Sequence, residues 1–184
     1  RAPLLPLRIF RLPPLAAANT VMVLVGCVAL SEFFVLSLYM QDVLDYSALQ
    51  SGVAFVAFAL TVVIASNVAQ VVIGRIGIRP ALTGGLLASA ISVALLARLP
   101  VEGRYFWDLF PAYVLGGAGL AFAFVSVTIA SLAGVRPSDA GVASGLINTS
   151  RQIGGAIGLA AVSAIAATST SNYVDAHPGV APTS

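Results

Sequence analysis

The chain has few chemically reactive side chains. Its 184 residues include one cysteine, one histidine and no lysine, and only 9% of them are charged. A disulfide needs two cysteines and a zinc site needs several Cys or His ligands, so Cys27, within an apolar run, and His177, in a polar stretch, indicate neither. No Walker glycine loop, HExxH or GxSxG motif occurs. We therefore expect no enzyme, cofactor, metal site or nucleic-acid partner.

Apolar residues are abundant instead. They make up 59% of the chain, and the mean hydropathy is +0.99, which is not typical of a soluble domain. A helix of about 20 residues crosses a hydrocarbon core of ~30 Å, and continuous apolar runs of this length are too long for barrel strands. We predict an all-α, polytopic transmembrane helical bundle. Its five predicted spans are residues 15–40, 49–73, 81–99, 109–133 and 140–167.

The arginines predict the orientation of these spans. Cytoplasmic connections of membrane proteins are enriched in basic residues. Six arginines fall in alternate connections, and two fall in the others. The six are Arg1, Arg8, Arg11, Arg75, Arg79 and Arg136, and the two are Arg98 and Arg104. Residues 1–14 are thus predicted to be a cytoplasmic lead-in, and residues 168–184 an external, flexible loop or tail after five crossings.

The fifth span carries a permanent cation. Arg151 lies within an apolar run, where a charge costs about 2.5–3.5 kcal/mol even on lenient insertion scales. Helical spacing places Ser144, Asn148 and Arg151 on one stripe, with Gln152 beside it. Such a stripe indicates a solute pathway inside a bundle. The alternative, that Arg151 only ties helices together, remains open.

Glu32 is the second charge inside a predicted span. It lies about 26 Å from the cytoplasmic edge of its helix, on the same face as Tyr39. A low-dielectric site favours the neutral form of a carboxyl group, which suits a proton carrier. The alternative is that Glu32 reaches external water and titrates normally. An offset of about 9 Å along the bilayer normal predicts that Glu32 and Arg151 form no direct salt bridge.

Four segments together carry a family resemblance. They are LPLRIFR at Leu5–Arg11, LYMQDVLDYSALQSG at Leu38–Gly52, GRIGIRP at Gly74–Pro80 and SDAGVASGLINTSRQIGGAIGLA at Ser138–Ala160. In this order they resemble the C-terminal half of a major facilitator superfamily transporter from the fourteen-span drug:proton antiporter branch (EmrB/QacA type). The resemblance implies that the five spans are helices nine to thirteen of that branch and belong to its C-terminal six-helix bundle.

The same resemblance implies a function. The whole protein would export drugs or other amphiphilic or cationic organic compounds in exchange for protons, across the plasma (inner) membrane of a bacterium. The chain would then be a piece of a longer product, and its partners would be membrane lipid and the missing N-terminal bundle. A different interpretation is a non-transporting membrane fragment or a helical partner subunit.

One connection resembles the superfamily's short cytoplasmic signature, whose arginines form charge contacts between helices. Its residues here are Gly74, Arg75, Gly77 and Arg79. The signature usually has an Asp before the first basic residue, whereas this chain has Gly74. The resemblance thus implies a gating loop without its acidic partner, and the alternative is a simple positive-inside anchor.

Glycines predict where helices approach closely, because small residues let backbones meet in membranes. The fifth span contains two small-xxx-small pairs, and the fourth contains adjacent glycines. These residues are Gly141 with Gly145, Gly154 with Gly158, and Gly116 with Gly117.

Overall fold

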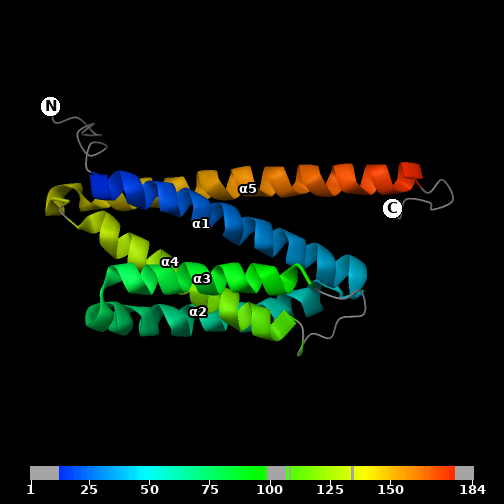
Figure 1. Cartoon of the computed structure of the whole chain (residues 1–184), viewed down its shortest axis with the longest axis horizontal. Coiled ribbons are helices and arrows are strands. Elements are labelled where there is room, and N and C mark those ends of the chain that lie inside the picture. The colour runs from blue at the N-terminus through cyan, green and yellow to red at the C-terminus, as the bar shows by residue number, and fades with distance from the viewer. Residues whose placement is uncertain (1–12, 99–106, 108, 134, 177–184) are drawn as a thin grey trace.

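The computed structural model describes residues 13–98, 107, 109–133 and 135–176. In this part of the chain, five helices are long and apolar enough to cross a membrane, which confirms the predicted all-α bundle (Figure 1). They are α1 (Pro13–Leu38), α2 (Ala48–Ile76), α3 (Ile78–Leu96), α4 (Phe110–Leu132) and α5 (Ala140–Ala176). A π-helical turn, η2 (Tyr39–Val43), extends α1, and a 3-10 turn, η4 (Pro137–Asp139), precedes α5.

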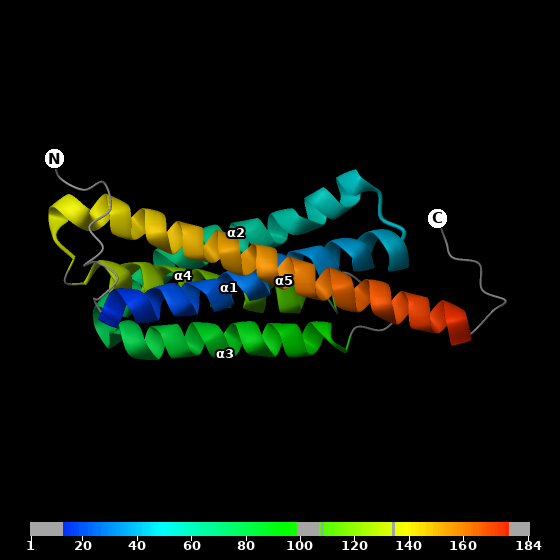
Figure 2. The same ribbon diagram turned by 90° about the horizontal axis from the view of Figure 1, so that it is seen from above.

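The helices pair in a fixed pattern. Helix α1 packs most extensively on α5, and α4 packs on α3 and α2. Helix α4 also contacts α1, which joins the two groups into one bundle. Figures 1 and 2 both show the C-terminal end of α5 projecting beyond the other helices.

Local chemistry sets the ends of α2 and α3. Ser47 caps α2, because its hydroxyl accepts a bond from the Gln50 backbone and the Gln50 side chain accepts one from the Ser47 backbone. At the other end, Gly77 has φ 88°, a left-handed conformation that glycine adopts without steric cost. Helix α3 begins at the next residue, so it covers Ile78–Leu96 rather than the predicted 81–99. Hydropathy alone does not detect such a one-residue link.

Helix α5 is longer than the apolar run that predicts it. The sequence predicts a flexible stretch from residue 168, whereas residues 168–176 continue the helix. Thr168 and Thr170 donate their hydroxyl protons to the carbonyl oxygens of Ala164 and Ala166, so the polar side chains bond within the helix. Residues 1–12 of the predicted lead-in and 177–184 of the predicted tail lie outside the described residues.

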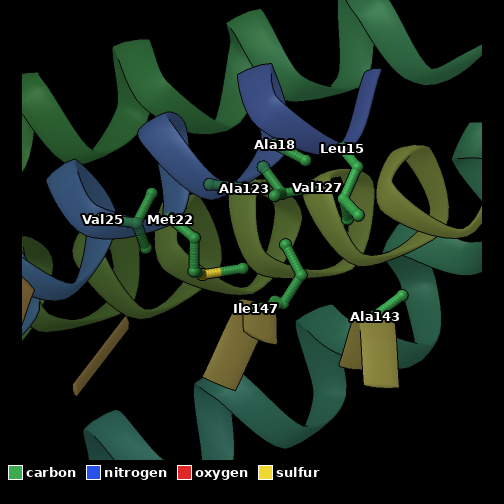
Figure 3. Packing of buried hydrophobic residues seen from close by; sticks show 8 residues of the cluster. All are labelled: Leu15, Ala18, Met22, Val25, Ala123, Val127, Ala143 and Ile147. Atoms are coloured by element: carbon green, nitrogen blue, oxygen red, sulfur yellow. The ribbon is translucent and has the colours of Figure 1, made fainter. Parts of the chain in front are cut away.

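One apolar core joins α1, α4 and α5 near the start of α1. Figure 3 shows its side chains converging from these three helices. It consists of Leu15, Ala18, Met22, Val25, Ala123, Val127, Ala143 and Ile147. A second cluster, near the end of α1, includes Leu36, Met40, Ala54, Leu109 and Tyr113. These clusters hold the helices between which the polar residues lie.

Candidate functional site

The predicted polar residues divide between two different pockets. Glu32 and Tyr39 line a pocket of about 500 Å³ formed by α1, α3 and α5. Asn148 and Arg151 line a pocket of about 280 Å³ formed by α1, α2, α4 and α5. The linings have no residue in common among those the structure describes. The acid and the cation thus face separate spaces.

Arg151 bonds within its own helix. Its Nη2 donates to Asn148 Oδ1 at 3.1 Å, one turn earlier in α5. The predicted stripe brings these two residues together, because residues three apart share a helix face. Ser144 and Gln152, the other predicted residues of this stripe, are exposed on α5 and do not line the Arg151 pocket.

Glu32 shares a hydrogen-bonding site with α3 and α4. The fully buried Ser92 hydroxyl of α3 lies 3.2 Å from Glu32 Oε1 and 2.8 Å from the carbonyl oxygen of Ala112 in α4. A Cβ added at Gly116 would lie 2.6 Å from Ser92 Oγ and 3.0 Å from Glu32 Oε1. Gly116 therefore leaves the space in which the carboxyl and hydroxyl groups meet.

Ser92 was not identified from the sequence. Serines are common in apolar membrane helices, and this one is 60 residues from Glu32 in the chain. The same holds for Ser150 of α5, whose hydroxyl donates to Asn19 Oδ1 of α1 at 2.6 Å. The only available signal was a polar residue within an apolar span, which does not reveal its partner.

An aromatic group near the end of α1 was also not predicted. The rings of Phe33 in α1 and Phe55 in α2 stack with centroids 4.2 Å apart. Phe55 and Phe58 both contact the ring of buried Tyr113 in α4, at 5.8 and 6.0 Å. The Tyr113 hydroxyl donates to Met40 Sδ at 3.4 Å. This group connects α1, α2 and α4.

The predicted packing glycines differ in their surroundings. A Cβ at Gly154 would overlap the carbonyl group of Val23, and one at Gly158 would lie 2.5 Å from the Cys27 carbonyl oxygen, so α5 touches the α1 backbone at both. One at Gly117 would lie 3.2 Å from the carbonyl oxygen of Phe58 in α2. By contrast, Gly141 and Gly145 have no described atom within 4 Å of such a position.

The predicted gating loop is almost entirely helical. Gly74 and Arg75 lie in the last turn of α2, and Arg79 lies in the first turn of α3, on either side of Gly77. Both arginines are exposed, and the described part of the chain places no acidic side chain in an ion pair with either. The structure therefore provides an exposed cationic joint between α2 and α3.

Five apolar spans that hold an acid and a cation between them define a polytopic helical membrane protein. The family model of the Major Facilitator Superfamily matches residues 1–159. The chain belongs to the Major Facilitator Superfamily. It is thus a member of a transporter family, as predicted, rather than an enzyme.

Bacterial relatives named as export or resistance proteins match most of the chain. The cephamycin export protein of Amycolatopsis lactamdurans is 36% identical over 98% of this chain and 39% of that protein. The puromycin resistance protein of Streptomyces alboniger is 34% identical over 79% of this chain and 29% of that protein. The tetracenomycin C resistance and export protein of Streptomyces glaucescens is 32% identical over 90% of this chain and 30% of that protein. The matched part of this chain thus spans between 29% and 39% of each relative.

Proposed function

We propose that this chain forms part of a proton-coupled antiporter that exports drugs or other amphiphilic organic compounds. The family and the export roles in the names of these relatives support the transport of drugs. The observation that supports the proton coupling is the contact of Glu32 with Ser92, whose hydroxyl group also contacts the Ala112 carbonyl oxygen.

The single hydroxyl proton of Ser92 relates that contact to the protonation state of Glu32. A serine hydroxyl has one proton to donate and can also accept. If it donates to the nearer Ala112 carbonyl oxygen, at 2.8 Å, its 3.2 Å contact with Glu32 needs the carboxyl group as donor. If Glu32 is ionised, the hydroxyl must turn toward the carboxylate and leave Ala112. The two protonation states of Glu32 thus use different bonds between α1, α3 and α4.

The packing of α1 on α5 would transmit a change in the bonding of Glu32 to the pocket that Arg151 lines. The Arg151 carbonyl lies directly against Gly26 of α1, and Gly154 and Gly158 hold the next turns of α5 equally close. A movement of α1 that follows proton loss at Glu32 would therefore carry Arg151 with it. Alternating access in such carriers moves one bundle against another around a site near the midplane.

The intact carrier would contain a second bundle. We infer that the chain belongs to the C-terminal six-helix bundle of a fourteen-span carrier in a bacterial plasma membrane. Its N-terminal end would then lie in the cytoplasm. Membrane lipid and the N-terminal bundle of the same transporter would cover faces of α2 that expose Leu49, Val63 and Ile64.

The test is proton-driven transport by the complete reading frame that encodes this chain, purified and reconstituted into liposomes. An imposed proton gradient should drive movement of a fluorescent amphiphilic dye. Glu32→Gln should slow this movement at least tenfold and flatten its pH dependence, because Gln neither binds nor releases a proton. Asp42→Asn, at an exposed position of η2, is the matched control and should transport normally. An unchanged rate and pH profile in Glu32→Gln would refute the proton role.

A further inference from the structure

The Arg151 pocket has a cation and no opposite charge. Its described lining combines the Arg151 guanidinium and the Asn148 amide with apolar side chains and Ser66, and it contains no Asp or Glu. A guanidinium carries five N–H donors, and the described contact of Arg151 is a single bond to Asn148. The remaining donors have the geometry that binds a carboxylate through two parallel bonds. A ligand cation in this pocket would meet like charge without compensation.

The walls of this pocket continue toward the stacked phenylalanines. On α1, Phe33 lies one turn beyond the pocket residue Ala29, and on α2, Phe55 lies two turns from the pocket residue Val62. The stacked Phe33 and Phe55 rings bridge α1 and α2 at this point. Phe33 is nevertheless 51% exposed, so much of its surface is free to contact a ligand.

The spacing of the cationic and aromatic ends defines a ligand length. The Arg151 carbonyl lies against Gly26, and Phe33 is seven residues further along α1, so the two backbone positions are about 10 Å apart along the helix axis. The guanidinium reaches back toward Asn148, one turn earlier in α5, which lengthens the span from cation to ring to about 10–15 Å. A flat ring system joined to an acidic group by a short chain spans this distance.

We propose that the α1–α2 face of this pocket binds an amphiphilic organic anion, with its aromatic rings against Phe33 and Phe55 and its anionic group on Arg151. This inference rests on the proposed export function and names the chemical class of its substrate. It narrows the expected substrates to anions, because the Arg151 guanidinium repels the organic cations that the family resemblance also allows.

Three compounds with the same rings and different charges test this site. They are pyrenebutyrate (anionic), pyrenebutanol (neutral) and pyrenebutylamine (cationic). Binding of tritiated pyrenebutyrate is measured by scintillation proximity on the complete transporter in nanodiscs, without a proton gradient, with empty nanodiscs subtracted. Unlabelled pyrenebutanol and pyrenebutylamine serve as competitors. We expect each to bind at least tenfold more weakly than the anion, which corresponds to about 1.4 kcal/mol.

Variants assign this preference to residues. Arg151→Gln should abolish it, and Arg151→Lys should keep most of it, because it retains the charge. Phe33→Leu and Phe55→Leu should weaken binding of all three compounds at least threefold. Arg98→Gln and Trp107→Leu change exposed residues outside the pocket and should leave binding unchanged.

Two results would overturn the assignment: equal or tighter binding of pyrenebutylamine to the unmodified protein, or unchanged anion binding in Arg151→Gln. Because binding is measured without a gradient, failure of the antiport proposal is visible separately. Intact anion binding without proton-driven transport would contradict the antiport proposal and leave this site standing. Proton-driven transport without anion preference would contradict the anion site and leave the antiport proposal standing.

Discussion

Gly26 of α1 lies so close to the backbone of Arg151 in α5 that a methyl group at position 26 would overlap the Arg151 carbonyl oxygen. Arg151 is therefore held against α1 by its backbone and not by its side chain. The charged head remains free to face the pocket while its helix is held in register.

The first prediction concerns this contact. Gly26→Ala should force α1 and α5 apart and destabilise the protein by about 1–3 kcal/mol, the usual cost of overpacking. Thermal unfolding of the complete transporter in detergent should occur about 1–3 °C lower. Gly141→Ala is the matched control, since its new methyl group meets open space. Equal melting temperatures for the two variants would contradict the packing argument.

The second prediction concerns Ser92. Ser92→Ala removes the donor available to an ionised Glu32, and a hydrogen bond to a charged group contributes about 1.5–3 kcal/mol against about 1 for a neutral one. The protonated form loses less, so the variant should hold its proton to higher pH. The pH profile of dye transport in proteoliposomes should shift toward alkaline pH. Ser89→Ala, one turn away on the same helix and outside the Glu32 pocket, is the control. An acid shift in Ser92→Ala would reverse the assigned bonding.

The third prediction concerns orientation, which follows from the arginine distribution. In a Cys27→Ala background, single cysteines at Ser47 and Tyr173 should react with an impermeant thiol reagent added to intact cells. Cysteines at Ile78 and Ser138 should react only after permeabilisation. All four positions lie at or near helix ends. Labelling of position 78 in intact cells would show that the chain starts outside.

The fourth prediction is that the 184-residue chain does not transport by itself. It matches 29–39% of the export and resistance proteins described above, and one half of a carrier provides only one wall of an alternating site. Reconstituted alone into liposomes with an imposed proton gradient, it should move no dye above the level of empty liposomes. Gradient-dependent dye movement by this chain would rule out the half-carrier interpretation.

The sequence predicts the spans better than it predicts the contacts between them. Hydropathy is local, so five helices follow from composition and length alone. The Arg151 to Asn148 bond is also local, since three residues separate them on one helix. The partner of Glu32 depends instead on how α3 packs against α1 and α4, which no local pattern encodes. The stacking of Phe33 on Phe55 has the same origin, because it joins two helices that are not packed extensively on each other.

Helix ends were predicted less well than helix centres for a similar reason. The start of α3 depends on the left-handed conformation of Gly77, and the end of α5 on hydroxyl groups that bond within the helix. Both are properties of a few atoms, to which an average over about 20 residues is insensitive.

The link at Gly77 has a mechanical consequence. Only one non-helical residue separates α2 from α3. Neither helix can therefore slide past the other along the membrane normal unless a helical turn unwinds. The two helices are joined directly at this end, and both pack on α4. The connection between α1 and α2 contains a short non-helical stretch with Asp45 in a left-handed conformation. We therefore expect this connection to accommodate insertions more readily than the link at Gly77. An inserted epitope tag would therefore be tolerated near Asp45 and would disrupt the bundle at Gly77.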